Sequence, residues 1–367
     1  MMVALAPEST YVCLLSDNVL PNIIPLADPS TRPRKIVLVT SQGHEERVRW
    51  FKQATEGWNL EIHTTMGNPY SYDAMHTMMS HLVQLHDRIV VNVTGGTKLM
   101  ALAAFDVCHG QYPVMYVDSQ NKTIQILDPG INDLGWPQDL KIKRYLGSYG
   151  YTVISKGSQN TSAAWRQVGE ELANCRDKWY LDLINLNWMA SARRQDFRRP
   201  MLIASRDLTW LLEEHGLIER AGQERWKFTD EDARDFLNGT WFESYVFSRL
   251  RHMQRDLQIS ELTINLVVSK NGVKNELDIV FISGNRLYII ECKTKNFDRD
   301  GTAQQMHPVY KLDSTGGHVG GLMGKSLLMS YHPLTPAVRR RCQEVQIAYI
   351  DSTRAIDTEL MKWIRGS

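Results

Sequence analysis

Residues 275–293, with the sequence NELDIVFISGNRLYIIECK, restrict the possible folds more than any other stretch of this 367-residue chain. Two apolar, β-rich runs lie on either side of a Gly-Asn dipeptide at 284–285, which favours a tight turn. The pattern predicts two antiparallel strands joined in a hairpin. Side chains alternate between the two faces of a strand, so Glu291 and Lys293 share one face. Asp278, near the start of the first strand, is then expected to lie close to Glu291, near the end of the second.

Two carboxylates and one ammonium at the end of a hairpin form a recognisable chemical set. The carboxylate oxygens of Asp278 and Glu291 are hard ligands that suit Mn²⁺ or Mg²⁺. Lys293 would hold and polarise an attacking water, or neutralise charge that develops in a phosphoryl transition state. The alternative is a strand with exposed charges, because a Glu-x-Lys sequence alone is common. The combination within one hairpin favours a metal-dependent hydrolytic site.

This spacing resembles the PD-(D/E)xK nuclease superfamily. Asp278 matches its first acid and residues 291–293 match its E-x-K half, although Leu277 replaces the proline of the family name. Such enzymes often carry another glutamate on a preceding helix, a position that Glu243 fits. The resemblance implies that Asp278, Glu291 and Glu243 hold Mn²⁺ or Mg²⁺ and that Lys293 positions the nucleophile. It also implies a restriction-endonuclease-like α/β domain that cleaves DNA or RNA, predicted over residues 238–367.

A predicted helix from Thr302 to Lys311 follows the hairpin. We expect it to place Gln304, Tyr310 and Lys311 beside a substrate groove. The glycine-rich sequence GGHVGG at 316–321 is expected to be a flexible substrate-side loop or a turn.

Composition indicates an ordinary soluble protein with nearly balanced charge, because 42 basic residues stand against 41 acidic ones. Any phosphate-binding surface must therefore be local. The five cysteines are scattered and mostly lie among apolar neighbours, as reduced core residues of a cytoplasmic protein do. The sequence shows neither a signal peptide nor an apolar run of membrane-spanning length, so we expect no membrane partner.

The N-terminal part alternates short apolar runs with helical segments. Runs at 11–15, 35–39 and 89–93 are rich in β-formers and each is followed by a polar loop. This alternation predicts a doubly wound, Rossmann-like sheet over residues 1–150. Ligands of such sheets bind beyond the carboxyl ends of the strands. The loops expected there contain Ser16, Asp17 and Asn18, then Thr40, Ser41 and Gln42, and then Thr94, Gly95, Gly96, Thr97 and Lys98.

The last of these loops, residues 94–98, has the chemistry of an anion site. It offers backbone amides at the start of a helix, two hydroxyls and one ammonium, which together suit a phosphodiester. It is neither a Walker A loop nor a G-x-G-x-x-G loop. The alternative is that Gly95 and Gly96 only permit a tight turn between strand and helix.

The sequence Asn-x-Thr-Gly-Gly-Thr-Lys at 92–98, followed by a helix rich in small residues, resembles the CRISPR-associated Rossmann fold (CARF) domain. The resemblance covers about residues 8–145. It implies a homodimer that binds a cyclic oligoadenylate across its two-fold axis, with residues 94–98 on the ligand phosphates. The loops at 16–18 and 40–42 would then approach ribose and adenine. Cyclic tetraadenylate is the expected activator, because a four-fold ring presents equivalent halves to a two-fold site.

Residues 151–237 have a helical pattern and then a short hairpin, which predicts a winged-helix-like linker. Such modules bind DNA in some proteins and serve as linkers or dimer surfaces in others. Acidic residues crowd the same elements, which favours the linker role. The arginines available for DNA are Arg193, Arg194, Arg198, Arg199 and Arg206, and the acidic residues are Glu213, Glu214, Glu219 and Glu224.

CARF-like domain, linker and nuclease-like domain, in that order, resemble the ligand-activated accessory nucleases of type III CRISPR systems. The resemblance implies a homodimer that cleaves DNA or RNA when cyclic oligoadenylate binds. Two other functions stay open from the sequence. One is a transcription regulator that binds DNA through the winged helix, and the other is a repair or restriction nuclease that needs no ligand.

Overall fold

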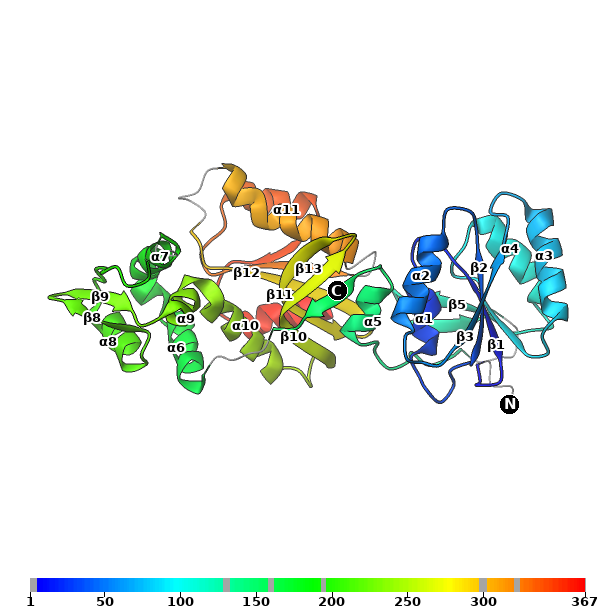
Figure 1. Ribbon diagram of the computed structural model, residues 1–367, viewed down its shortest axis with the longest axis horizontal. Coiled ribbons are helices and arrows are strands. Elements are labelled where there is room, and N and C mark those ends of the chain that lie inside the picture. The colour runs from blue at the N-terminus through cyan, green and yellow to red at the C-terminus, as the bar shows by residue number, and fades with distance from the viewer. Residues whose placement is uncertain are drawn as a thin grey trace.

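The structure is a computed structural model that describes residues 5–127, 133–157, 162–192, 196–296, 302–319 and 324–366. The molecule is elongated (Figure 1). One sheet with its helices forms the N-terminal end, a second sheet lies in the middle, and a helical module with a small hairpin forms the other end.

The N-terminal sheet has the strand order β3-β2-β1-β4-β5-β6. Strands β1 to β5 are parallel and β6 is antiparallel to β5, which confirms the predicted Rossmann-like fold. Central strands of a parallel sheet are buried on both faces, which explains their uniformly apolar runs. The strands are β1 (Thr10–Leu14), β2 (Lys35–Thr40), β3 (Glu61–Met66), β4 (Ile89–Asn92), β5 (Val114–Asp118) and β6 (Thr123–Ile126).

Helices cover both faces of this sheet (Figure 1). On one face lie α1 (Leu20–Ile23) and α2 (Glu45–Ala54). On the other lie α3 (Tyr72–Gln84) and α4 (Lys98–Cys108), which bury Met75, Met79 and Met100 against the strands. The doubly wound arrangement brings the loops after β1 and β4 together, because these two strands are neighbours at the sheet centre.

The second sheet has the order β14-β13-β12-β11-β10-β7. Each neighbouring pair in the series β7, β10, β11 and β12 is antiparallel, whereas β12, β13 and β14 pair in parallel. The predicted hairpin is confirmed, with β11 paired to β12 on either side of the turn at 284–285. The strands are β7 (Thr152–Ser155), β10 (Ile259–Lys270), β11 (Val273–Ser283), β12 (Arg286–Lys293), β13 (Lys325–Ser330) and β14 (Ala348–Ile350).

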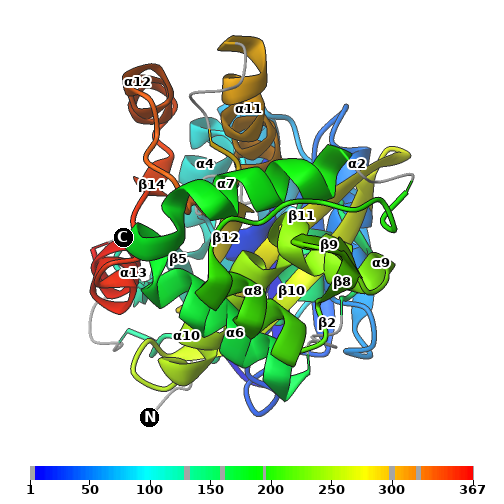
Figure 2. The same ribbon diagram turned by 90° about the vertical axis from the view of Figure 1, so that its left-hand side faces the viewer.

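Two pairs of helices cover the second sheet (Figure 2). On one face lie α11 (Thr302–Val319) and α12 (Pro336–Glu344), which pack on Leu287, Ile289 and Leu328. On the other lie α10 (Trp241–His252) and α13 (Ile356–Arg365), which pack on Tyr288 and Ile290. Because Glu291 and Lys293 continue the series of Leu287 and Ile289, they lie on the α11 face of the sheet.

The helical module contains the predicted helix followed by a hairpin. Helix α8 (Arg206–Glu214) precedes the antiparallel strands β8 (Ile218–Gly222) and β9 (Arg225–Phe228). Around them lie α6 (Ala163–Asn174), α7 (Arg176–Ala192) and α9 (Glu231–Asp235). One apolar core runs from Val168 in this module to Ile364 in α13. The proposed division of the chain at 150 and 237 stays a prediction.

Two details differ from the sequence prediction. Helix α11 continues to Val319, so the expected loop or turn is wrong for residues 316–319, while Gly320 and Gly321 lie outside the described residues. Strand β7 falls where only helices were expected, and it pairs with β10 at the edge of the second sheet. Its residues Thr152, Val153 and Ile154 are β-formers, but one short run next to a helical stretch was not assigned to a strand.

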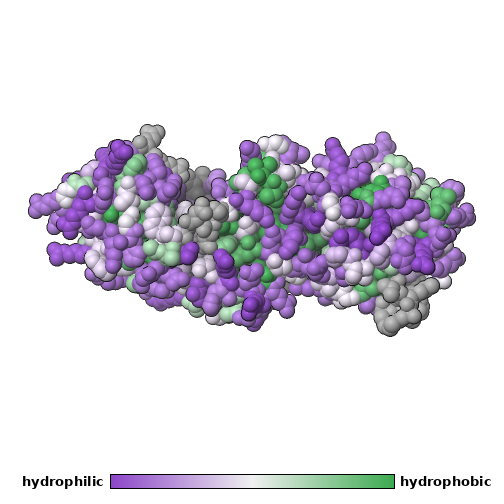
Figure 3. Space-filling view, turned by 60° about the horizontal axis from the view of Figure 1, so that its bottom comes forward, coloured by the Kyte–Doolittle hydropathy of each residue, from purple (hydrophilic) through white to green (hydrophobic). Residues whose placement is uncertain are grey.

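The face drawn in Figure 3 is mostly hydrophilic, with a few apolar areas among the polar side chains. Over the described ranges, no helix is both long and apolar enough to cross a bilayer. All five cysteines are free thiols.

Candidate active site and candidate ligand site

The hairpin brings the predicted acidic pair together. Continuing the register in which Ile279 faces Ile290 places Asp278 opposite Glu291. Both are buried, with residue exposures of 7% and 2%. The backbone amide of Cys292 donates a hydrogen bond to Asp278 Oδ2 at 2.8 Å. This bond fixes the orientation of the Asp278 carboxylate.

Lys293 lies beside both acids, as predicted. Its Nζ is 2.7 Å from Glu291 Oε1 and 3.6 Å from Asp278 Oδ2. Cys292 points to the opposite face and packs into the core under α10. The alternation expected of an extended E-x-K segment is therefore confirmed.

A second lysine reaches the same acids from α11. Lys311 Nζ lies 2.6 Å from Glu291 Oε2 and 3.7 Å from Asp278 Oδ1. Sequence reasoning placed Lys311 near the substrate groove and did not assign it to the acidic pair. The order of residues cannot show that α11 crosses the sheet at this point, so no sequence signal was available.

Burial and mutual repulsion change the protonation of this cluster. Burial, followed by the charge of Asp278, raises the pKa of Glu243 to about 8. Burial raises the pKa of Asp278, and the Lys293 ammonium opposes that shift. Burial alone would lower the pKa of Lys293, but the charges of Asp278 and Glu291 outweigh it and raise this pKa. Glu243 lies in the first turn of α10 and is electrostatically coupled to the pair.

The acidic pair has the geometry to share one cation. Asp278 Oδ1 and Glu291 Oε2 both face the Lys311 ammonium, so their oxygens converge on one positively charged group. Hard carboxylate oxygens in this arrangement fit Mg²⁺ or Mn²⁺. Within the described ranges, no three His, Cys, Asp or Glu side chains form a metal-binding group. A cation here would therefore rest on two carboxylates, with other positions left to water and substrate, as Mg²⁺ commonly does.

In the N-terminal domain the loop at 94–98 is built for close packing. A Cβ on Gly95 would lie 2.0 Å from the carbonyl oxygen of Leu14, and Gly96 has φ +74°. Both positions therefore require glycine. Thr97 caps α4, with its hydroxyl accepting a hydrogen bond from the Met100 amide. The tight-turn interpretation thus has direct support, and the same turn leaves Thr97 and Lys98 exposed.

Thr94 has a structural role in this loop. Its hydroxyl donates to Asn92 Oδ1 at 2.6 Å and accepts from the Val117 amide at 2.7 Å. Asn92 is buried and donates to the Tyr11 hydroxyl at 2.7 Å. The Thr94 hydroxyl therefore joins β4 to β5.

The loops after β1 and β2 lie at the same sheet edge as the 94–98 loop, with the β1 loop between the other two. Asp17 is exposed and pairs with Arg47 of α2 at 2.9 Å. The Ser41 hydroxyl contacts His44 Nδ1 at 3.0 Å. Arg47 was missed by the sequence analysis, because its approach to this edge depends on how α2 packs. The remaining predicted residues of these loops are the half-buried Ser16 and Asn18, the buried Thr40 and the exposed Gln42.

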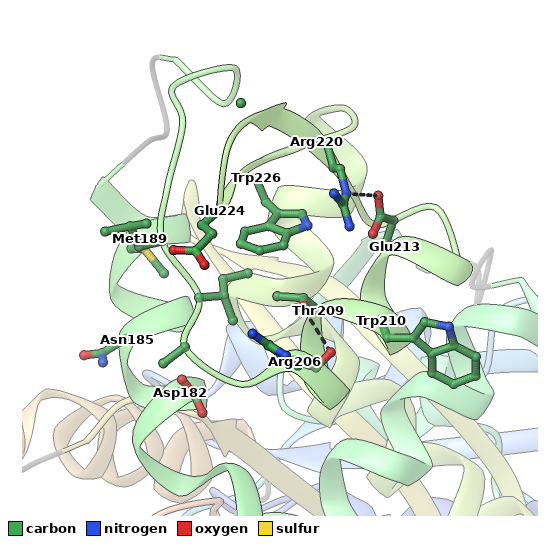
Figure 4. Close-up of a pocket in the computed structure, with 14 residues that line it drawn as sticks. Asp182, Asn185, Met189, Arg206, Thr209, Trp210, Glu213, Arg220, Glu224 and Trp226 are labelled. Atoms are coloured by element: carbon green, nitrogen blue, oxygen red, sulfur yellow. Dashed lines mark hydrogen bonds and ion pairs between the residues drawn. The ribbon is translucent and has the colours of Figure 1, made fainter.

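The helical module carries a groove of 910 Å³ whose lining does not include the acidic pair (Figure 4). Trp210, Trp226 and Arg206 line it. Arg220 is also part of the lining and pairs with Glu213 at 3.4 Å. The charges of the groove lining are mixed: Asp182, Glu213 and Glu224 are acidic, whereas Arg206 and Arg220 are basic. This balance gives no attraction for a phosphate backbone. Of the linker arginines, Arg193 and Arg194 lie outside the described residues.

The fold and the two sites define a class of protein: a CARF-type Rossmann domain joined to an endonuclease-type α/β domain. The family model described as the Card1 CARF domain matches residues 10–145, and that of the Card1-like endonuclease domain matches residues 230–366. Can2 from Sulfobacillus thermosulfidooxidans, solved with cyclic tetra-adenylate, is 38% identical, with a TM-score of 0.87. The match covers 97% of this chain and 99% of Can2. The chain therefore belongs to the family of Can2 and Card1-like CARF endonucleases.

Two other solved structures share the fold. VC1899 from Vibrio cholerae is 23% identical over 98% of each chain, with a TM-score of 0.86. A type III CRISPR defence DNA nuclease activated by cyclic oligoadenylate is 17% identical, with a TM-score of 0.58. That match covers 90% of this chain and 48% of the nuclease. No protein of curated function matches the sequence.

Proposed function

We propose that this protein is a metal-dependent nuclease of type III CRISPR defence that cyclic tetraadenylate activates. The observation that carries the proposal is the buried pair Asp278 and Glu291 with Lys293 beside it, in a chain whose other sheet is of the CARF type. Can2, which the chain resembles over nearly its whole length, was solved with this ligand.

In the proposed reaction Asp278 and Glu291 hold one Mn²⁺ or Mg²⁺ ion, with Glu243 supporting it directly or through water. The ion would act as a Lewis acid on the scissile phosphate and lower the pKa of a bound water. Lys293 positions the attacking water and stabilises charge that develops on the phosphate oxygens. Glu243, with its pKa of about 8, is mostly protonated at neutral pH.

The proposed ligand site is the sheet edge formed by the three loops. The amides at the start of α4 and the Lys98 ammonium favour ligand phosphates, while Thr97, whose hydroxyl donates to the Pro69 carbonyl oxygen at 2.9 Å, holds the loop in place. Asp17 carries negative charge and suits a ribose hydroxyl better than a phosphate. Thr94, Gly95 and Gly96 shape the loop. Ser16, Asn18, Thr40, Ser41 and Gln42 complete the proposed set.

A homodimer would place two of these edges face to face. The exposed side of α4 supports this arrangement, because Leu99 and Leu102 are 39% and 58% exposed directly beside Lys98. Exposed apolar side chains next to a ligand loop suit an isologous contact, in which the same surface of both subunits meets.

The direct test is to incubate the purified protein with Mn²⁺ and labelled single- or double-stranded DNA and RNA. Each reaction is run with cyclic tetraadenylate, with cyclic hexaadenylate and without ligand. We expect cleavage of at least one substrate only with the tetraadenylate, and none by Glu291→Ala. Full ligand-dependent cleavage by Glu291→Ala would contradict the active-site assignment. Equal cleavage with and without the cyclic ligands would contradict the proposed ligand-sensing role and favour a repair or restriction nuclease. Ligand-dependent DNA binding without cleavage would favour a transcription regulator.

A further inference from the structure

Lys311 and Lys293 both contact the acidic pair. Lys293 contacts Glu291 Oε1 and approaches Asp278 Oδ2, whereas Lys311 contacts Glu291 Oε2 and approaches Asp278 Oδ1. Lys311 Nζ is within hydrogen-bond distance of both Glu291 oxygens, at 2.8 and 2.6 Å. Each carboxylate is thus shared between two ammonium groups.

The two lysines reach the pair from different parts of the fold. Lys293 belongs to β12, the strand that carries Glu291, so its position is fixed by the sheet. Lys311 comes from α11, and its side chain must extend from the helix to reach the acids. A flexible four-carbon stem lets an ammonium leave one partner for another while the helix stays in place. Lys293 has the same stem, but its ammonium also donates to the Cys292 carbonyl oxygen at 3.0 Å, whereas within the described residues the Lys311 ammonium contacts only the two acids.

Charge neutralisation explains why Lys311 lies on this pair. The Glu291 and Asp278 side chains are only 3% and 10% exposed, and buried carboxylates require a cationic or hydrogen-bonding partner. The side chains of Lys311 and Lys293 are 27% and 26% exposed, so both ammonium groups are partly accessible to solvent. The Lys311 ammonium lies on the two oxygens, Oδ1 and Oε2, that are not nearest to Lys293. A divalent cation shared by both acids would compete with this ammonium for the carboxylate oxygens.

We propose that Lys311 is a second active-site lysine that competes with the divalent cation for Glu291 and Asp278. Its ammonium stabilises the acids until the cation binds. It then moves away from the two carboxylates and contacts the phosphate of the substrate. The apparent affinity for the cation is reduced by the fraction of protein in which Lys311 lies on the acids. This inference rests on the proposed function, since it takes Asp278 and Glu291 as the residues that hold the cation.

The competition can be measured without any nucleic acid or cyclic ligand. Mn²⁺ binding to the full-length protein is titrated by electron paramagnetic resonance, for wild type, Lys311→Met, Lys311→Arg and Glu291→Gln. Methionine keeps an apolar stem of similar length and removes the charge, while arginine keeps the charge. The control is Lys362→Met, which removes the same charge from an exposed pair with Glu359 on α13.

We expect Lys311→Met to bind Mn²⁺ roughly tenfold more tightly than wild type, because one competing positive charge is gone. Lys311→Arg and Lys362→Met should bind as wild type does or more weakly. Cleavage by Lys311→Met should fall despite tighter binding, since the phosphate contact is lost. Unchanged or weaker Mn²⁺ binding by Lys311→Met would overturn the proposal. If Glu291→Gln bound Mn²⁺ as well as wild type, the proposed metal site itself would be wrong. This variant therefore distinguishes a failure of the proposed function from a failure of the competition by Lys311.

Discussion

The carboxylate of Asp139 accepts a hydrogen bond from the backbone amide of Asn285 at 2.5 Å. It also accepts one from the Gly284 amide at 2.9 Å, while Asn285 Oδ1 accepts from the Leu140 amide at 2.7 Å. The segment that leaves the CARF domain thus holds the turn of the hairpin whose other end carries Asp278 and Glu291. This contact joins the proposed ligand domain to the strands of the proposed active site.

We predict that Asp139→Ala lowers the free energy of unfolding by about 2 kcal/mol, because two amides lose a charged acceptor. Ligand-stimulated cleavage should fall while the affinity for cyclic tetraadenylate stays unchanged. Calorimetry gives the first quantity, a cleavage assay the second and isothermal titration the third. Asp139→Asn keeps one acceptor and should be intermediate. A variant with lower stability and full activation would show that the contact is only structural.

Two residues of the 94–98 loop should respond in opposite ways. Thr94→Val leaves the Val117 amide without its side-chain acceptor, while Asn92 Oδ1 keeps the Thr94 backbone amide as a donor, so the free energy of unfolding should fall by about 2 kcal/mol. Lys98→Ala removes an exposed ammonium, so stability should hold while affinity for cyclic tetraadenylate falls about tenfold. Thermal unfolding and ligand titration on both variants test this difference. A Lys98→Ala protein that binds the ligand normally would remove residue 98 from the proposed site.

The exposed side of α4 should determine the oligomeric state. We expect wild type to be a dimer and Leu102→Glu to be a monomer by light scattering, because a charge would enter the contact surface. Leu85→Glu is the matched control, since Leu85 is 64% exposed at the C-cap of a different helix, α3. Dimers of equal stability for Leu102→Glu and wild type would place the interface elsewhere.

His332 should make the protein less stable in mild acid. It is 1% exposed, packs edge-on against Tyr180 and Tyr331, and neither ring nitrogen has a hydrogen-bond partner in the described part of the chain. Burial and then the charge of Arg176 lower its pKa to about 4. The unfolded chain therefore binds the proton first as pH falls below the ordinary histidine value of about 6.5. Stability is lost between that pH and about pH 4, by up to about 3 kcal/mol.

The comparison that isolates this effect is His332→Phe. Phenylalanine fills a similar volume and does not titrate, so the variant should lose less stability than wild type between pH 7.5 and pH 5. Urea midpoints at the two pH values measure the difference. Equal acid sensitivity in both proteins would assign the loss to other groups.

The sequence predicted the parts of the site that local geometry determines. A Gly-Asn turn between alternating apolar runs was enough to place Asp278 opposite Glu291, because strand register follows from turn and pleat. Lys311 and Arg47 could not be assigned in this way, since each reaches its partners through the packing of a helix on a sheet. The structural role of Thr94 could not be predicted either. Its hydroxyl accepts a hydrogen bond from Val117 in β5, which is separated from Thr94 in the sequence by helix α4.

Strand β7 has a consequence for how such proteins can be assembled. The chain enters the second sheet at residues 152–155, leaves it for the helical module, and returns for the remaining five strands. A gene fusion joined at residue 230, where the endonuclease match begins, would leave β10 with a bare edge open to intermolecular pairing. A recombination event that replaces the endonuclease domain and leaves no such edge must therefore join the chains before β7. The helical module between β7 and α10 is then inherited together with the endonuclease domain.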